Sequence, residues 1–200
     1  MKKYISDLHF YGDCLNQFDK RPFNSVEEMN KYMINQWNSV VKSGDIVIVL
    51  GDMFATKDAK QINSVLSRLN GKIRLVEGNH DKEWLKVPGV NLNRFEWIKP
   101  YAEFEDGDFL VIASHYPTFC YNHQHLKTKD GRYRTFMLYG HVHNSEEAQL
   151  IDKLQNIVRE TITTNKAGET KNLPSQMINC FCMRSDYKPL TLEEWASNGY

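Results

Sequence analysis

Short apolar runs separated by polar turns recur along the chain, and their length is typical of β-strands. Six runs are clear, and two more are expected between residues 95 and 106, on either side of Pro100. The six clear runs cover residues 3–6, 45–50, 72–76, 109–114, 135–139 and 176–183. The pattern therefore predicts a chain in which strands occur over most of the length.

Between these runs, apolar residues recur at helical spacing. The sequence SVEE at 25–28 is a capping box and opens a helix, and a second helix follows Thr56 and stops at Gly71. A third helix is expected from Ser145, and a short last one from Thr191. Strand and helix thus alternate in the first half of the chain, which predicts parallel βαβ units, whereas the second half contains more strands.

This order of elements predicts an α/β fold with a large mixed sheet, or two packed sheets, and helices outside. At 200 residues the chain fits one domain, 1–200, and it shows no internal repeat and no linker. Residues 145–175 are expected to form a helix and a flexible loop, TTNKAGETKNLPS, inserted before the last strand.

Charge and apolar content narrow the classes of function. Twenty-five basic residues balance 25 acidic ones, so a general nucleic-acid binder, which needs a basic excess, is disfavoured. A small phosphorylated substrate stays compatible with this balance. The start, MKKYISDLHF, does not resemble a signal peptide and no segment reaches transmembrane length, so a cytoplasmic protein without membrane contact is expected.

The cysteines fit a reducing compartment. Cys14 and Cys120 stand alone, and Cys180 and Cys182 lie two apart in the apolar run MINCFCM. Spacing of two in a strand would place both thiols on one face, where reduced packing residues are favoured over a disulfide or a zinc pair.

Polar side chains of the types that bind metals follow five of the predicted strands, and five of the seven histidines lie there. The carboxyl ends of parallel strands are where α/β proteins bind ligands, so these side chains should converge. Imidazole and carboxylate groups suit Zn, Mn, Fe or Co. The candidate ligands are Asp7, His9, Asp52, Asn79, His115, His141 and His143.

Seven ligands are too many for one tetrahedral ion and suit two ions if one carboxylate bridges them. Glycines at 51, 78 and 140 would let the backbone approach a ligand closely. Each motif alone has an ordinary alternative, because a Gly-Asp after a strand is usually a turn; the recurrence favours metal. Two divalent ions, two carboxylates and a bridging hydroxide leave about one net positive charge, which favours a phosphate substrate.

The blocks DLH, GD, GNHD, SHYP and GHVH, in this order over residues 7–143, resemble those of the calcineurin-like metallophosphoesterases. The resemblance implies a four-layer α/β/β/α fold, a two-sheet β sandwich with mixed sheets flanked by helices. It implies two divalent ions, with Mn favoured among Mn, Fe, Zn and Co. One ion would be held by Asp7, His9, Asp52 and His143, and the other by Asp52, Asn79, His115 and His141, with Asp52 bridging.

The departures from the family are informative. GDMFATK and GNHD replace the GDxVDRG and GNHE blocks of the protein phosphatases, and no arginine follows Gly51 as in that branch. The chain is more similar to small single-domain bacterial and phage members, which open with a DxHFGH-like block and carry an RPF segment. Here that block reads DLHFYGD, so its second histidine is absent.

In the mechanism that the resemblance implies, a hydroxide bridging the metals attacks phosphorus, and His80 acts as general acid or stabilises the leaving alkoxide. Asp81 either orients His80 or caps a helix. Two further candidates for substrate binding are Arg21, in FDKRPF, and Arg132, in the basic hairpin KTKDGRYR at 127–134. For both arginines, a solvated position is the alternative.

The function expected from the sequence is therefore hydrolysis of a phosphate ester, with a phosphodiester or a nucleotide-type substrate favoured. The partner would be a small phosphorylated molecule, a nucleotide or a short oligonucleotide. Alternatives are a phosphomonoesterase, a nuclease, and a metal-binding scaffold of the same fold without catalysis. All ligand positions and His80 are filled, which favours the enzyme over the scaffold.

Overall fold

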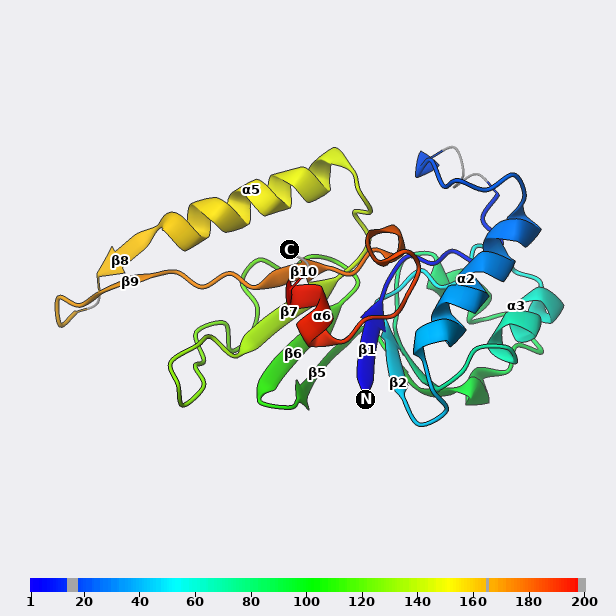
Figure 1. The fold of residues 1–200 in the computed structure, drawn as a ribbon, viewed down its shortest axis with the longest axis horizontal. Coiled ribbons are helices and arrows are strands. Elements are labelled where there is room, and N and C mark those ends of the chain that lie inside the picture. The colour runs from blue at the N-terminus through cyan, green and yellow to red at the C-terminus, as the bar shows by residue number, and fades with distance from the viewer. Residues whose placement is uncertain (14–17, 165, 198–200) are drawn as a thin grey trace.

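Two four-stranded sheets pack face to face, with helices on the outer side of each, in the computed structural model of the chain (Figure 1). The structure describes residues 1–13, 18–164 and 166–197. This is the α/β sandwich that the sequence predicts, with the two sheets that the resemblance to the metallophosphoesterases implies.

The first sheet is parallel throughout, in the order β1-β2-β3-β4. Its strands are β1 (Lys2–Ile5), β2 (Ile46–Val49), β3 (Lys72–Val76) and β4 (Phe95–Lys99). Helices α2 (Val26–Val40) and α3 (Ala59–Leu66) connect the first three strands and cover the outer face of this sheet (Figure 1, right). The parallel βαβ units expected from the alternation of strand and helix are thus present.

The second sheet is mixed, in the order β10-β7-β6-β5, and its β5–β6 hairpin is antiparallel. Its strands are β5 (Tyr101–Asp106), β6 (Phe109–Ser114), β7 (Thr135–Tyr139) and β10 (Met177–Asn179). Shorter elements complete the fold: α4 (Asp81–Trp84), α6 (Leu192–Ser197) and the 3₁₀ turns Leu92–Arg94 and Cys182–Ser185.

Alternation along the strands divides the core into layers. In β2, Val47 and Val49 pack with the helices outside the first sheet, whereas Ile48 packs between the sheets. In β6, Val111 lies between the sheets and Ile112 on the outer face of the second sheet. Because a strand has a period of two residues, strands such as β2 and β6 bury side chains on both faces of their sheets, whereas β4 and β5 at the sheet edges are partly exposed.

The segment before the last strand differs in part from the expectation. Helix α5 (Glu146–Glu160) is present, and it packs through Ile151 against the outer face of the second sheet. The stretch expected as a loop instead contains an antiparallel pair, β8 (Ile162–Thr164) and β9 (Thr170–Asn172). This pair continues the line of α5 beyond the end of the sheet (Figure 1, left). Its strands are mostly exposed, so their sequences do not show the buried apolar pattern by which a strand is predicted.

The last strand is shorter than the predicted run 176–183. Strand β10 ends at Asn179, whose side-chain Oδ1 accepts a hydrogen bond from the backbone N–H of Phe181 (3.1 Å). The chain then crosses to the first sheet, where Phe181 bridges to Ser6. Cys180 therefore packs between the sheets and Cys182 outside the first sheet, so the expectation that both thiols share one face was wrong.

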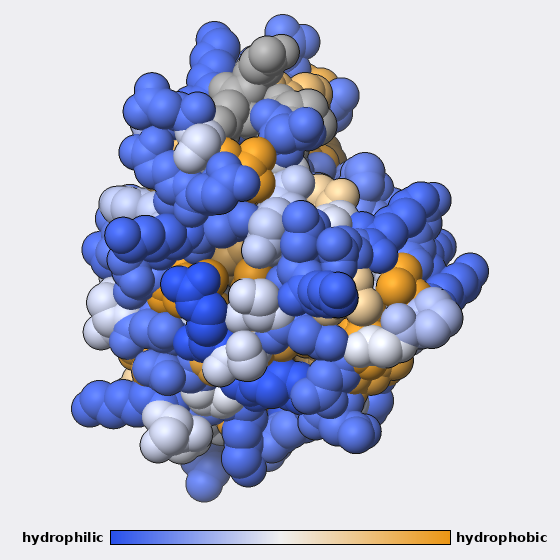
Figure 2. Space-filling model, turned by 90° about the vertical axis from the view of Figure 1, so that its right-hand side faces the viewer, coloured by the Kyte–Doolittle hydropathy of each residue, from blue (hydrophilic) through white to orange (hydrophobic). Residues whose placement is uncertain are grey.

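Both of these thiols are free and buried, as expected for packing residues, and Cys120 is free and exposed. Cys14 lies outside the described residues. Among the described residues, no helix combines the length and the apolar character needed to cross a bilayer. The face that carries α2 and α3 is largely hydrophilic, with hydrophobic residues in separate small patches (Figure 2).

Candidate metal centre

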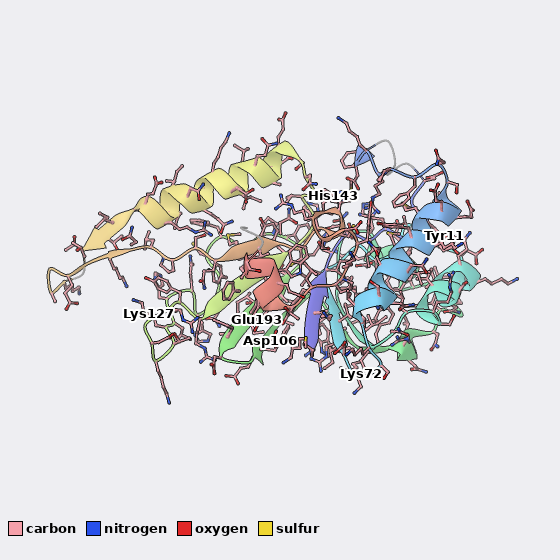
Figure 3. The ribbon with its side chains drawn as sticks, in the orientation of Figure 1. Tyr11, Lys72, Asp106, Lys127, His143 and Glu193 are labelled. Carbon is pink, nitrogen blue, oxygen red and sulfur yellow. The ribbon has the colours of Figure 1, made fainter. Side chains whose placement is uncertain are left out.

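The loops that follow β1, β2, β3, β6 and β7 meet where the two sheets come together at their carboxyl ends. These loops carry the seven predicted ligands, and the structure brings all seven into one region: Asp7, His9, Asp52, Asn79, His115, His141 and His143. A cavity of about 390 Å³ opens over them; its lining comprises His9, Phe18, Asp52, Ala55, Asn79, His80, His141 and His143. In Figure 3, His143 marks this region above β1 and β7.

Five of the candidate ligands have a left-handed backbone that non-glycine residues rarely adopt. Their φ angles are 54° at Asp7, 46° at His9, 55° at Asp52, 70° at His141 and 47° at His143. Such a conformation costs of order 1 kcal/mol or more per residue and persists where the surroundings enforce it. Because these five conformations cost stability and occur together at the strand ends, they indicate a functional site.

Two of the predicted glycines are required by close approach rather than by backbone angle. A Cβ atom at Gly78 would overlap the carboxylate of Asp52, and one at Gly140 would come within 2.5 Å of Asp7 Oδ2. Both contacts are far inside van der Waals distance, so any side chain there would displace a candidate ligand.

Backbone amides orient the two carboxylates. The N–H of His141 donates to both oxygens of Asp7 (3.0 and 3.1 Å), and the N–H of His80 donates to Asp52 Oδ1 (2.9 Å). Asp52 Oδ2 is left to face the imidazoles, 3.6 Å from His9 Nε2 and 3.5 Å from His115 Nε2. Asp52 thus lies between two histidines, which is the place that the sequence assigned to a bridging carboxylate.

Two compact groups of metal-binding atoms can be recognised among the described residues. One comprises Asp7, His9 and His143, and the other comprises Asp7, Asp52 and His115; the ligand atoms within each group lie within 4.8 Å of one another. Asp7 belongs to both groups, so it too lies between the two halves of the site. The structure therefore offers two carboxylates at the centre, where the sequence singled out Asp52 alone.

The amide of Asn79 joins the second half of the site. Its Oδ1 lies 3.0 Å from His115 Nε2 and 3.1 Å from His141 Nδ1. The other nitrogen of His115, Nδ1, lies 2.9 Å from the carbonyl oxygen of Leu50 and donates its hydrogen there. This contact turns Nε2 of His115 toward Asp52 and Asn79, as a metal ligand requires.

The chemistry of this donor set fits divalent ions. Nε2 of His9 is buried and has no hydrogen-bond partner, an arrangement that costs free energy unless something else binds the nitrogen. Burial, together with the neighbouring His143, holds the pKa of His9 well below its usual range. Burial lowers the pKa of His141 as well. Both rings are therefore neutral at neutral pH, which is the form that binds metals.

The pKa of Asp52 is raised, chiefly by burial and also by the nearby carboxylate of Asp7, although His115 opposes the shift. Two carboxylates held this close in a buried site repel each other, and a bound cation would relieve that repulsion. An orphaned imidazole and a destabilised pair of carboxylates are therefore explained by one kind of occupant, a divalent cation.

His80 lies beside this group rather than in it. Its side chain is exposed and lines the cavity, and its ring lies 5.2 Å from that of His9, centroid to centroid. It is the first residue before α4, so its position is fixed by the backbone while its ring faces the cavity. That placement suits a group that acts on a bound substrate.

Asp81 does not have the place that the sequence assigned to it. Its carboxylate is fully buried, and it accepts hydrogen bonds from the N–H groups of Asp52 (2.7 Å), Met53 (2.9 Å) and Gly78 (2.8 Å) and from Nε1 of Trp84 (2.7 Å). These bonds tie the loop after β2 to the loop after β3. Asp81 is therefore a structural link between two ligand loops, neither a helix cap nor, by these contacts, an orienting partner of the His80 ring.

Neither predicted substrate-binding arginine faces the cavity. Arg21 is 3% exposed and donates to the carbonyl oxygens of Leu8 (2.8 Å) and Asp7 (2.9 Å), so it holds the first ligand loop from behind. Arg132 is exposed, pairs with Asp130 (2.7 Å), and lies beside the β5–β6 turn. That turn is at the opposite end of β6 from His115, a strand length of about 20 Å away. Figure 3 shows Lys127, at the start of this hairpin, well apart from His143.

Three residues around the histidines were missed. Phe18 is 72% exposed and its ring lies 5.9 Å from that of His143, and Tyr116 lies 4.6 Å from the ring of His141. Asp19 accepts a hydrogen bond from Nδ1 of His143 (2.6 Å). Asp19 stands two residues before Arg21 in the segment FDKRPF, so an acidic residue beside the singled-out arginine was the available signal.

Comparison with known proteins identifies relatives in sequence. The chain is similar to the uncharacterised protein MJ1445 of Methanocaldococcus jannaschii, 42% identical over 95 residues that cover 47% of this chain and 54% of that protein. The chain thus matches about half the length of that relative. The Gene 66 protein of Mycobacterium phage L5 is 27% identical over 161 residues, 70% of this chain and 76% of the phage protein.

Among solved structures, the fold is similar to that of AQ665 from Aquifex aeolicus, a protein of unknown function, with a TM-score of 0.64, 23% identity and coverage of 98% of both chains. The family model of the calcineurin-like phosphoesterases matches residues 3–176, which include every strand-end block described above. The chain therefore belongs to the calcineurin-like phosphoesterase family.

Proposed function

We propose that this protein is a dinuclear metal-dependent phosphoesterase that hydrolyses a phosphodiester or a nucleotide-type substrate. The family is one of hydrolases, and the described residues include the Asp and His groups that such chemistry needs. We take Mn²⁺ as the ion of the proposal; the imidazole, carboxylate and amide oxygen ligands suit it, as they suit Fe, Zn and Co.

One observation carries the proposal: Oδ2 of Asp52 lies between Nε2 of His9 (3.6 Å) and Nε2 of His115 (3.5 Å). Each imidazole belongs to a different half of the site. A carboxylate oxygen that faces both halves is the arrangement that lets two ions share one ligand. In a mononuclear site, only one of these two histidines would bind the ion.

Bound divalent ions would polarise the phosphoryl oxygens and supply an activated water as nucleophile. The protein side chains would orient the ions and assist the leaving group. Asp7 and Asp52 are pre-oriented by the amides of His141 and His80, so the ligand set does not have to reorganise when it binds. His80, exposed in the cavity, is placed to give a proton to the leaving oxygen or to stabilise it.

Two features favour a diester or a nucleotide. Two divalent ions held by the two carboxylates would give the site a net positive charge, which suits the negative charge of a phosphodiester. The cavity of about 390 Å³ also has an exposed aromatic side chain, Phe18, at its wall. An aromatic ring beside a phosphate site offers a surface on which a base can stack.

Hydrolysis of bis-p-nitrophenyl phosphate beside p-nitrophenyl phosphate, with Mn²⁺ and with chelator, tests the proposal. We expect metal-dependent cleavage of the diester that largely disappears in His80→Ala. Cleavage of the monoester alone would replace the proposal by a phosphomonoesterase. Metal binding without cleavage of either ester would favour a scaffold of the same fold without catalysis.

A further inference from the structure

The two ring nitrogens of His143 face different partners. Nε2 lies 3.6 Å from Oδ1 of Asp7, within the first group of candidate ligands. Nδ1 lies 2.6 Å from Oδ1 of Asp19, whose side chain is 4% exposed. A carboxylate accepts, so in the neutral ring the hydrogen is on Nδ1 and the lone pair of Nε2 is on the side of the candidate metal position.

Asp19 is itself held in place. Its Oδ2 accepts a hydrogen bond from Nε of Arg21 (3.1 Å) and forms an ion pair with a terminal nitrogen of the same guanidinium (3.1 Å). Arg21 in turn donates to the carbonyl oxygens of Asp7 and Leu8. One oxygen of Asp19 therefore binds His143 and the other binds Arg21. Through Arg21, His143 is connected to the backbone of the loop that carries Asp7.

Other contacts fix the plane of the His143 ring without choosing its ligand nitrogen. The ring stacks on Phe181 at 4.6 Å and 21°, and the backbone carbonyl of His143 accepts from Nδ2 of Asn179 (2.8 Å). A ring turned over by 180° would keep both contacts but would put Cδ2 in the place of Nδ1 and Cε1 in the place of Nε2. Asp19 breaks this near-symmetry, because it pairs with a protonated nitrogen on one side of the ring.

His115 is oriented in the same way as His143, by a hydrogen bond from Nδ1, but to a different acceptor. Its Nδ1 donates to the carbonyl oxygen of Leu50, and its Nε2 faces Asp52. One histidine of each half of the site is thus held by an acceptor behind the ring. For His143 that acceptor carries a charge, which makes the ring a more basic ligand and the hydrogen bond stronger.

We propose that Asp19 is a positioning residue of the metal centre: it holds His143 with its hydrogen on Nδ1 and thereby presents Nε2 to the ion shared with Asp7 and His9. The proposal rests on the proposed dinuclear site. Asp19 touches neither the metal position nor the substrate, so its effect should appear in metal binding even where activity is not measured.

The test is titration of the metal-free full chain with Mn²⁺ by calorimetry, for wild type, Asp19→Asn, Arg21→Gln and Asp108→Asn. In Asp19→Asn we expect one of two binding events to weaken by about 10- to 100-fold while the other is unchanged. Asp108→Asn makes the same chemical change at an exposed position of the β5–β6 turn and should bind as wild type does. Arg21→Gln removes the other partner of Asp19 but leaves its contact with His143.

A second readout separates positioning from loop stability. In ¹⁵N-histidine spectra of the Zn²⁺-loaded chain, wild type should show His143 with a slowly exchanging hydrogen on Nδ1, and Asp19→Asn should lose that signal. Arg21→Gln should keep it, although we expect this variant to unfold at a lower temperature than the wild type.

Three outcomes overturn the proposal. In the first, Asp19→Asn binds both ions as tightly as wild type. In the second, Asp19→Asn and Arg21→Gln lose affinity and stability equally and both keep the His143 signal, so that Asp19 serves Arg21 alone. In the third, wild type binds no Mn²⁺, which removes the proposed function and this inference together; the first two leave the proposed function standing.

Discussion

The backbone N–H of His80 donates a hydrogen bond of 2.9 Å to Oδ1 of Asp52. The residue proposed to assist the leaving group and the carboxylate between the two halves of the site are therefore held in one fixed relationship. The bond uses the backbone of His80 and leaves its ring free to face the cavity. The imidazole can thus be removed without disturbing Asp52.

This separation predicts the effect of His80→Ala. We expect the rate of diester hydrolysis to fall by about 10²- to 10⁴-fold, as is typical when a proton-transferring group is lost. Mn²⁺ affinity should stay at the wild-type value, because the amide bond to Asp52 is retained. Steady-state kinetics and calorimetric titration on the same preparation check both parts. Loss of metal binding in this variant would show that the ring is a ligand.

Asp81→Ala should act mainly on stability. It leaves three buried backbone N–H groups and the indole N–H of Trp84 without an acceptor, which we expect to lower the free energy of unfolding by about 3 to 5 kcal/mol. Asp58→Ala is the matched control, since Asp58 caps α3 at the surface and its loss should cost about 1 kcal/mol. Urea denaturation measures both values, and equal midpoints for the two variants would refute the structural role of Asp81.

The two arginines should behave differently from substrate contacts. Arg21→Ala removes a buried guanidinium that holds two backbone carbonyls, so we expect a loss of about 2 to 4 kcal/mol of stability. Arg132→Ala, in the exposed hairpin, should change neither the stability nor KM for the diester. An increase in KM for Arg132→Ala would place the hairpin at the substrate after all.

Much of the fold was predictable because it follows from local pattern. Strand β2 is a run of four apolar residues, IVIV, which indicates a buried strand without information from elsewhere in the chain. The end of β10 was not predictable in this way. It depends on the side chain of Asn179 and on a bridge between Phe181 and Ser6, residues far apart in the sequence.

The site shows the same division. The ligand types at strand ends are local, and parallel topology brings them together without further information. The roles of Asp81 and Arg21 depend instead on which backbone groups fold around them. Asp81 accepts from Asp52 and Met53, and Arg21 donates to Asp7 and Leu8, and no pattern in the sequence reveals these partners.

Metal binding should depend on pH with a definite sign. Burial alone would lower the pKa of His143, but the hydrogen bond to Asp19 and the carboxylate of Asp7 outweigh it, so the pKa is raised. In the metal-free chain this ring is therefore at least half protonated at about pH 6.5 and must lose its proton when an ion binds. Affinity should fall as pH is lowered through this raised pKa.

Calorimetry in buffers of different ionisation enthalpy measures the proton release directly. We expect more protons released per ion at about pH 6.5 than at about pH 8.5. Burial lowers the pKa values of His9 and His141, so these rings should contribute less to this difference than His143 does. Equal proton release at both pH values would contradict the protonated state of His143.

The cysteines give a prediction that is independent of the metal. Cys120 is exposed, whereas Cys180 and Cys182 are buried, and burial raises the pKa of Cys182 to about 12. Iodoacetamide should therefore alkylate Cys120 in the native chain at least about 100-fold faster than the two buried thiols. Peptide mass spectrometry with a guanidinium-unfolded control checks this, and rapid native labelling of Cys180 would contradict the packing between the sheets.

The central claim is that this chain holds two divalent ions around Asp7 and Asp52, and the number of bound ions tests it most directly. Calorimetric titration of the metal-free protein with Mn²⁺, checked by elemental analysis of the loaded chain, gives that number. We expect two ions per chain in the wild type and at most one in Asp52→Ala, because the carboxylate of Asp52 faces both His9 and His115. One ion or none in the wild type would contradict it.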